Sequence, residues 1–476
     1  MLFNSWVFLA FMPLVFCIYW FVCNRSLRLQ NAFLAIASFI FYGWWSITFL
    51  LLLLLSLFVD FFVGYFLQKT EKESGRKILF ILSLVFNIGL LSIFKYFNFF
   101  AESLKSFLQI FGLHADFVTL HVILPVGISF YTFQSLSYTI QVYRRKMQAT
   151  TDIITYAAYI SFFPQLVAGP IEKAIHFLPQ FQQIRNFNYT ESIKGMRLIL
   201  WGFFKKVVIA DTCALYANDA FNNFHQYHGT ILILGAIYFS FQIYGDFSGY
   251  TDIARGLAKL LGFDLIVNFK YPYFSRNIAE FWRRWHISLT SWFRDYLFIP
   301  LGGSKVNMLK TIRNISIVFL ISGLWHGANF TFIVWGALHA LYYIPLILLK
   351  KTKTFSANTV AAETFLPSSK EIILMLFNFF LVTVAWVFFR SNNCMDAFHY
   401  FERMMMFKGF SFTGKSDAFI LVLFLICIDW IGRHNENTLD VLIHQFPKWR
   451  YFIYVSLGLM ILANFSKQAQ FIYFQF

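Results

Sequence analysis

The feature of this sequence that most limits its fold is a series of apolar runs, many of them near 20 residues long, with the charged residues held in the gaps between them. A helix of about 20 residues spans the hydrocarbon core of a bilayer. Such runs are too long and too continuous for the alternating strands of a membrane β-barrel. Only 13% of the 476 residues are charged, whereas a soluble domain carries about a quarter. The sequence therefore predicts an all-α polytopic membrane protein with about 11 transmembrane helices.

The basic residues predict its orientation. They gather in alternate gaps, at residues 25–28, 69–77 and 144–146. Because cytoplasmic loops carry the excess of Lys and Arg, these gaps are expected inside and the N-terminus outside. The polar loop at residues 350–370 is expected to be cytoplasmic or interfacial. Contact with anionic membrane lipids then explains the net charge of +16. Nucleic acid is not an expected partner, because no soluble basic domain is present in the sequence.

Neither cysteines nor carboxylates predict a metal site. The five cysteines are scattered and form no CxxC pair, so neither a disulfide framework nor a zinc site is indicated. Asp246 and Asp252 could hold a cation, but helix capping or pairing with Arg255 is the favoured interpretation. The P-loop, GxSxG and HExxH motifs of soluble enzymes are absent from the sequence.

The most unusual stretch is EFWRRWHISLTSWFRDYLFIPLGG, at residues 280–303. If it is one helix, an apolar stripe at three- and four-residue steps contains Trp282, Trp285, Leu289, Trp292 and Tyr296. The arginines fall largely off that stripe. Such a helix suits a membrane interface or the wall of a protein-lined cavity. A simple interfacial anchor is the alternative interpretation.

Two other stretches are predicted to break the helical pattern. Residues 154–167 are short for a span and are followed by AGP at residues 168–170, which indicates a broken or re-entrant helix. Residues 245–256, GDFSGYTDIARG, combine two carboxylates, three glycines and an arginine. A broken helix of this kind is tolerated where it lines a cavity, so we expect the substrates there. A serine nucleophile is weakly supported, because this segment has no histidine.

Among the histidines, His326 differs from the rest. It lies in SGLWHGAN, at residues 322–329, which interrupts apolar sequence on both sides. An imidazole is the natural base near neutral pH, and a histidine at membrane depth is expensive unless hydrogen-bonded. Gly323 and Gly327 allow a backbone or a ligand to approach closely. A satisfied structural histidine is the alternative. His339, expected on the same helix, is interpreted as a packing or supporting residue.

These motifs together resemble the membrane-bound O-acyltransferase superfamily, and within it the bacterial branch of alginate O-acetylation and teichoic-acid D-alanylation membrane subunits. The resemblance covers nearly the whole chain in order. Besides the two segments around His286 and His326, it is carried by MLFNSWVFLAFMPLVF at the start, LPVGISFYTFQSLSYTI (124–140), FFPQLVAGPI (162–171), WGFFKKVVIAD (201–211) and YGDFSGYTDIARG (244–256).

The resemblance implies one integral-membrane domain over residues 1–476, with helices around a central funnel. It implies that His326 is the catalytic histidine and that His286 is a second polar group in the same chamber. We expect His326 to act as general base and His286 to orient the acceptor or stabilise the oxyanion. The candidates for binding the donor's phosphates are Arg283, Arg284, Lys205 and Lys206, with a positive-inside anchor as the alternative for each. The expected substrate-binding residues are Trp282, Arg283, Arg284, Trp285, Trp325, Asn329, Asp246 and Ser248.

The expected reaction is transfer of an acyl group from a cytoplasmic thioester, such as acetyl-CoA, to a hydroxyl of an extracytoplasmic glycan or relay partner. Acetyl is the favoured acyl group. No tightly bound cofactor is expected. A secreted or membrane-anchored acetyltransferase is the expected partner, and the bacterial inner membrane the expected location. D-alanyl transfer from a carrier protein is the alternative within the class. A polysaccharide flippase or exporter is an alternative outside it, and release of free thiol from acetyl-CoA distinguishes an enzyme from it. A non-catalytic scaffold is another alternative, and it would tolerate substitution of both histidines.

Overall fold

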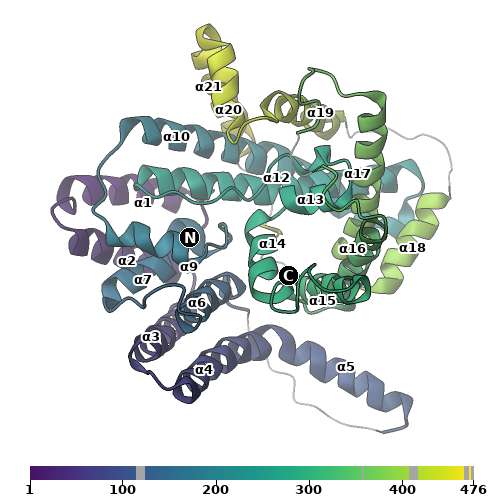
Figure 1. Ribbon diagram of the computed structural model, residues 1–476. Coiled ribbons are helices and arrows are strands. Elements are labelled where there is room, and N and C mark those ends of the chain that lie inside the picture. The colour runs from purple at the N-terminus through teal and green to yellow at the C-terminus, as the bar shows by residue number, and fades with distance from the viewer. Residues whose placement is uncertain (114–123, 356–358, 407–415, 466–470, 473–476) are drawn as a thin grey trace. The chain divides into compact units, whose positions relative to one another are not determined.

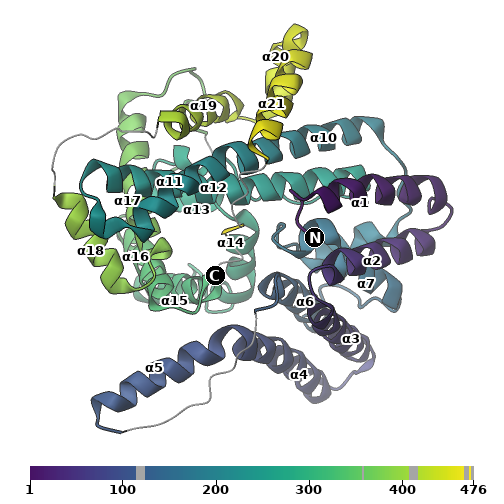
Figure 2. The ribbon, with the colours of Figure 1, turned by 180° about the vertical axis from the view of Figure 1, so that it is seen from behind.

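The computed structural model describes residues 1–113, 124–355, 359–406, 416–465 and 471–472, and within these ranges the regular secondary structure is helical (Figures 1 and 2). The contacts divide the chain into two compact units. Unit 1 consists of Met1–Gly195 and Ala254–Leu265, and unit 2 of Met196–Ile253 and Ile266–Phe476. The all-α class that the apolar runs predict is confirmed.

Unit 1 is a set of apolar helices, of which α1 to α4 follow one another through short turns. Helix α2 packs on α7, and α3 and α4 both pack on α6, with α3, α4 and α6 side by side in both ribbon views (Figures 1 and 2). Its elements are α1 (Trp6–Cys17), η1 (Ile18–Val22), α2 (Leu27–Gly43), α3 (Ile47–Lys69), α4 (Glu73–Leu91), η2 (Ser92–Tyr96), α5 (Phe97–Ile110), α6 (Ile128–Tyr143), α7 (Ile153–Ser161), α8 (Phe163–Leu166), α9 (Ala174–Phe177) and η3 (Leu178–Gln182).

The break predicted within residues 154–167 is confirmed. Helix α7 ends at Ser161, and Phe162 leaves the helical region with φ −47° and ψ 103°. Helix α8 then begins at once, with Pro164 in its first turn, where the missing N–H of proline costs no hydrogen bond.

Unit 2 holds the motifs that the sequence singles out. Helix α10 (Tyr189–Phe203) passes into it from unit 1, and α12 (Thr230–Leu260) ends in unit 1. Its other elements are η4 (Phe204–Ala210), α11 (Asp211–Asn222), η5 (Phe224–Gln226), η6 (Pro272–Phe274), α13 (Ile278–Arg284), α14 (Ile287–Phe293), η7 (Arg294–Phe298), α15 (Met308–His326), α16 (Phe330–Leu348), α17 (Ser369–Arg390), α18 (Cys394–Met405), α19 (Ser416–Gly432), α20 (Thr438–Gln445), η8 (Pro447–Trp449) and α21 (Arg450–Asn464).

The predicted break in residues 245–256 is wrong, because α12 runs through them without interruption. The glycines serve close packing instead. A Cβ at Gly249 would lie 2.7 Å from the carbonyl oxygen of Gly202, and one at Gly202 would lie 2.6 Å from that of Gly249. Small residues let membrane helices approach closely in this way.

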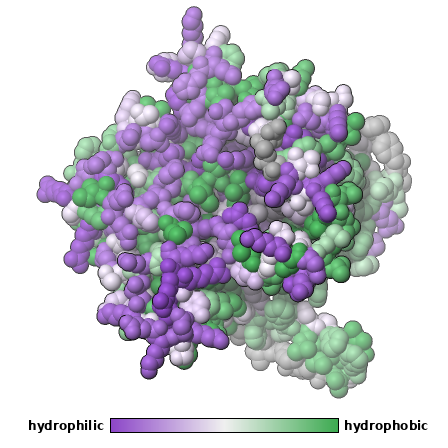
Figure 3. Space-filling view, viewed as in Figure 1, coloured by the Kyte–Doolittle hydropathy of each residue, from purple (hydrophilic) through white to green (hydrophobic). Residues whose placement is uncertain are grey.

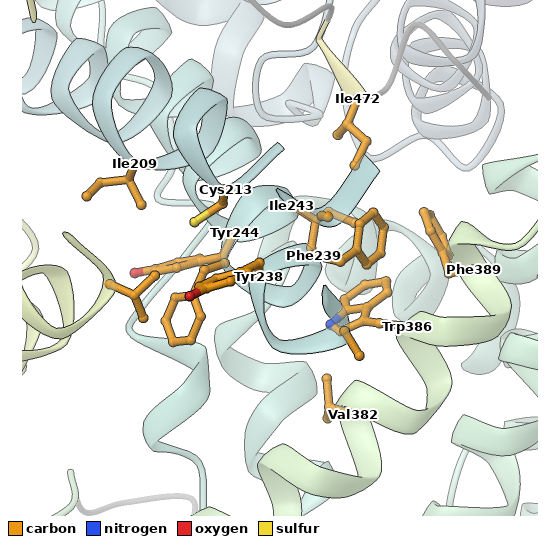
Figure 4. Packing of buried hydrophobic residues seen from close by; sticks show 14 of the residues in the cluster. Ile209, Cys213, Tyr238, Phe239, Ile243, Tyr244, Val382, Trp386, Phe389 and Ile472 are labelled. Carbon is orange, nitrogen blue, oxygen red and sulfur yellow. The ribbon is translucent and has the colours of Figure 1, made fainter. Parts of the chain in front are cut away.

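The core of unit 2 is dominated by aromatic side chains. Figure 4 shows Tyr238, Phe239 and Tyr244 of α12 packed with Trp386 and Phe389 of α17. Trp386 and Phe389 are each 1% exposed. Close packing of this kind makes the core stiff, so it can hold attached groups in a fixed geometry.

Within the described residues, six helical stretches are long and apolar enough to cross a membrane: α3, the continuous stretch Glu73–Ile110, α12, α15, α16 and α17. The outer surface of these helices is apolar too, and Figure 3 shows α5, at the lower right, as largely hydrophobic. Phe100, Phe107 and Ile110 of α5 are between 55% and 78% exposed, as side chains facing lipid are. Other apolar helices, such as α2 with 17 residues, are shorter, so the count of about 11 spans stays a prediction.

Candidate active site

The segment predicted as one helix over Trp282–Tyr296 is broken at Trp285 and His286. Helix α13 ends at Arg284, and α14 begins at Ile287. Between them His286 has φ +44°, in the left-handed region, which a non-glycine residue rarely adopts. The prediction of a continuous helix is therefore wrong at this point.

Backbone groups freed by this break bond to a neighbouring loop. The N–H of Ile287 donates to the carbonyl of Asn268 at 3.0 Å, and that of Lys270 donates to the carbonyl of Arg284 at 2.9 Å. The side-chain oxygen of Asn268 accepts from the N–H and the hydroxyl of Ser288 at 3.2 and 2.9 Å. Asn268 thus holds the break in place, and the His286 side chain is fully buried.

His326 is the last residue of α15, at the turn of a helical hairpin. Gly327 follows in an extended conformation with φ −165°. The next helix, α16, starts after Asn329, whose side-chain oxygen accepts from the N–H of Thr331 at 3.0 Å. Because the chain reverses here, His326 and His339 lie on two different helices, and the prediction that they share one is wrong. His326 is 4% exposed.

The two histidines lie together, and we call them the histidine pair. Their ring centroids are 6.4 Å apart. The ring of Trp325 lies 5.8 Å from that of His286 and 4.9 Å from that of His326. Phe247 lies 4.7 Å from His286. The pair is thus in an apolar, water-poor setting, in which an imidazole can transfer a proton and polar contacts are strong.

Other rings complete the enclosure of His326. The Trp335 and Phe389 rings lie 5.0 and 5.3 Å from it. Burial lowers the pKa of His286, which lies between helices and outside the apolar spans, from 6.5 to about 3. His286 is therefore neutral at physiological pH, so that it has one ring N–H to donate and one nitrogen to accept.

Trp282 and Trp285, both predicted to bind substrate, support the aromatic rings that enclose His326. The Nε1–H of Trp282 donates to Nδ1 of His339 at 3.3 Å, and the Trp282 ring lies 5.7 Å from that of Trp335. Trp285 is 1% exposed and packs 5.2 Å from Trp386. A chain of ring contacts therefore leads from α13 to His326.

A basic pocket lies beside α13. It has a volume of about 370 Å³, and its charged lining residues are Lys270, Arg283, Arg284 and Arg433 against Glu280 and Glu436. Its formal charge is therefore positive by two. Arg284 donates to Glu280 at 2.9 Å, whereas Arg283 donates through one nitrogen to the carbonyl of Thr352 at 3.0 Å. Its other terminal nitrogen is buried without a hydrogen-bond partner in the described part of the chain.

The remaining predicted residues have other contacts. Asp246 lies 2.9 Å from the ammonium of Lys206, and Ser248 is 1% exposed on the same helix. Asn329 caps α16 and donates to the carbonyl of Asn392 at 2.7 Å. Neither the ion pair of Asp246 nor the hydrogen bonds of Asn329 lead to the histidine pair.

The lysines of the WGFFKKVVIAD motif are paired internally. Lys205 lies 2.7 Å from Asp252, and Lys206 lies 2.8 Å from Asp211. Asp252 thus pairs with Lys205, and neither lysine lines the basic pocket. Among the residues that the structure describes, no three His, Cys, Asp or Glu side chains gather as they do around a metal ion.

Sequence reasoning missed several residues of the site. Asn268 lies in a stretch without a motif, and Arg433 lies far along the chain from Arg283. Phe247 lies in the GDFSGYTDIARG segment, but its contact with His286 was not predicted. Only contacts in space identify them. Glycine spacing could have indicated the close approach of α15 and α16, since Gly323 and Gly336 each face the backbone of the other helix.

The chain matches the membrane-bound O-acyltransferase family over residues 36–383. It is similar to a probable alginate O-acetylase of Pseudomonas aeruginosa, at 40% identity over 88% of this chain and 77% of that protein. It is also similar to a peptidoglycan O-acetyltransferase of Helicobacter pylori, at 33% identity over 98% of this chain and 90% of that protein. A teichoic acid D-alanyltransferase of Bacillus subtilis matches at 29% identity over 45% of this chain and 57% of that protein.

Proposed function

This chain belongs to the membrane-bound O-acyltransferase family and is an acyltransferase, and we propose that it transfers an acetyl group from a cytoplasmic thioester to a hydroxyl of a cell-envelope polysaccharide or of a relay partner. The observation that carries the proposal is the histidine pair, with ring centroids 6.4 Å apart in an aromatic enclosure. The similar proteins from Pseudomonas and Helicobacter are named for O-acetylation of alginate and peptidoglycan, which supports a polysaccharide acceptor.

In the proposed reaction His326 is the general base. It takes the proton of the acceptor hydroxyl as the oxygen attacks the thioester carbonyl. His286 donates a hydrogen bond to the oxygen that becomes negative, and because it is neutral it does so without placing a buried charge beside the base. The carbon–sulfur bond then breaks, and the proton on His326 passes to the thiolate. The products are an O-acyl ester and a free thiol.

The aromatic rings protect this reaction from water. Trp325, Trp335 and Phe389 surround His326 at centroid distances of 4.9 to 5.3 Å. Water at this position would hydrolyse the thioester, so its exclusion favours transfer to the acceptor.

The basic pocket supports a phosphate-bearing donor such as acetyl-CoA. Arg283 and Arg284 line it, and a guanidinium binds phosphate through paired N–H groups. Helix α13 has seven residues, which is about 10 Å of helix, and Trp282 on the same helix starts the ring contacts that reach His326. Trp282 directly precedes Arg283 and Arg284 at the end of this helix, so one short element would contact the donor's phosphates and begin the ring contacts toward its thioester.

Orientation and location form part of the proposal. The lysines of the loop at residues 350–370, whose Phe355 and Thr359 line the basic pocket, support a cytoplasmic position for that pocket. The basic gaps of the sequence support an N-terminus outside. We place the protein in the bacterial inner membrane, where a secreted or membrane-anchored acetyltransferase would receive or complete the transfer.

D-alanyl transfer is the second candidate. The teichoic acid D-alanyltransferases match at 29 to 30% identity over less than half of this chain, while the O-acetylating relatives match over 88% or more of it. The comparisons therefore favour acetyl over D-alanyl transfer.

The test compares His326→Ala with wild type in membranes from cells that lack the native gene. We expect base-labile acetate on envelope polysaccharide, and release of free thiol from acetyl-CoA, to fall by roughly 10²- to 10⁴-fold because the general base is lost. His444, exposed on α20, gives the matched control His444→Ala. Wild-type acetylation by His326→Ala, at an equal amount of folded protein, refutes the assignment.

A further inference from the structure

Two residues near the end of the chain are buried in unit 2. Phe471 is 4% exposed and Ile472 is 1% exposed. Figure 4 shows the Ile472 side chain pointing toward Ile243 and Phe239 of α12. Helix α21 has already ended at Asn464, so these two residues are placed by their own contacts and not by a helix.

A charged anchor holds this segment. The backbone N–H of Ile472 donates to Oδ2 of Asp246 at 2.7 Å. Oδ1 of the same carboxylate lies 2.9 Å from the ammonium of Lys206. A hydrogen bond to a buried carboxylate is among the stronger ones in proteins, and this one links the segment to the residue directly before Phe247.

Ring contacts connect the segment to the histidine pair. The Phe471 ring lies 4.9 Å from Tyr250 and 6.4 Å from Phe247. Phe247 is fully buried, and its ring lies 4.7 Å from His286, edge to face at 83°. Phe247 therefore has both Phe471 and the imidazole of His286 as ring neighbours, and that imidazole belongs to a residue in a strained left-handed backbone conformation.

We propose that Phe471 and Ile472 are positioning residues of the acyl-transfer site, which act through Phe247 on the orientation of His286. The inference rests on the proposed function. Asp246, predicted as a substrate-binding residue, has the role of the anchor. Loss of the bond between Ile472 and Asp246 lets the Phe247 ring turn. His286 then donates a weaker hydrogen bond to the oxyanion, while the basic pocket on α13 is unchanged.

The first test is Ile472→Pro, because proline removes the N–H that Asp246 accepts. We expect kcat for transfer from acetyl-CoA to fall by about tenfold or more, with the KM for acetyl-CoA within about twofold of wild type. Ile472→Val keeps the N–H and recovers most of the turnover. The activity is normalised to folded protein measured by size-exclusion chromatography in detergent.

The second test is Phe471→Leu, which keeps the backbone bond and removes the ring contact. We expect a smaller fall in kcat, again without a change in the KM for acetyl-CoA. Wild-type kcat in both variants overturns the inference, and so does a loss of activity that only follows the amount of folded protein. His326→Ala is run beside them: if it is inactive while Ile472→Pro is active, only the positioning role fails, and if it is active, the proposed function itself fails.

Discussion

Replacing Gly323 by alanine should disable the site without touching either histidine. Gly323 lies in α15, one turn before His326, and faces α16. A Cβ at this position would lie 3.0 Å from the carbonyl carbon of Phe332, with the carbonyl oxygen closer still. Both atoms belong to backbone, so neither can rotate away as a side chain could. The two helices must therefore separate.

The size of the movement follows from these distances. Ordinary contacts of a methyl group are near 3.4 Å or longer, so α16 has to move by on the order of 1 Å in a close-packed interior. Trp335 of α16, whose ring is 5.0 Å from that of His326, moves with it. A displacement of about 1 Å at a reacting centre lowers the rate by about 10²-fold, which is the loss we expect.

The assay is base-labile acetate on envelope polysaccharide per amount of folded protein, with release of free thiol from acetyl-CoA measured in parallel. Gly458→Ala in α21 is the matched control, because a Cβ there meets nothing within 4 Å in the described structure. Gly336→Ala tests the same interface from α16, since its Cβ would lie 3.0 Å from the carbonyl carbon of Phe319. Activity within twofold of wild type in both interface variants, each well folded, refutes the reasoning.

Two further predictions concern the basic pocket and His286. Arg283→Gln should raise the KM for acetyl-CoA about tenfold, because charge-assisted bonds to the donor are lost, while kcat stays unchanged. The control Arg294→Gln, at an exposed residue, should leave this KM unchanged. An unchanged KM for Arg283→Gln would show that the pocket is not part of the donor site. The pKa of His286 is about 3 in the folded chain against 6.5 as its ordinary value, so its contribution to stability is complete above pH 6.5 and is lost as the pH falls from 6.5 toward 3. As the pH is lowered from 6.5 to 4, the melting temperature of His286→Gln should therefore fall less than that of wild type. Identical pH profiles of the two melting temperatures would contradict this prediction.

The long apolar helices and the special place of His326 were predictable from sequence. Hydrophobic length alone indicates helices that cross a bilayer, and His326 stands out because SGLWHGAN interrupts apolar sequence on both sides. The end of α15 at His326 was not predicted. The 31-residue α12 was not predictable in the same way. Glycine can end a helix or let another backbone approach it, and only the position of Gly202 against Gly249 shows which of the two applies.

The break at His286 shows why the candidate site itself could be predicted only in part. The apolar stripe through Trp282 and Trp292 keeps the same spacing whether or not the helix is continuous, so periodicity cannot detect the break. What makes the break stable is Asn268, about 20 residues earlier, whose backbone and side chain accept three hydrogen bonds from Ile287 and Ser288. These bonds replace the ones that the helix gives up, which a buried backbone requires. A left-handed His286 thus depends on a long-range partner, and so does the 6.4 Å separation of the two imidazole centroids on which the proposed chemistry rests.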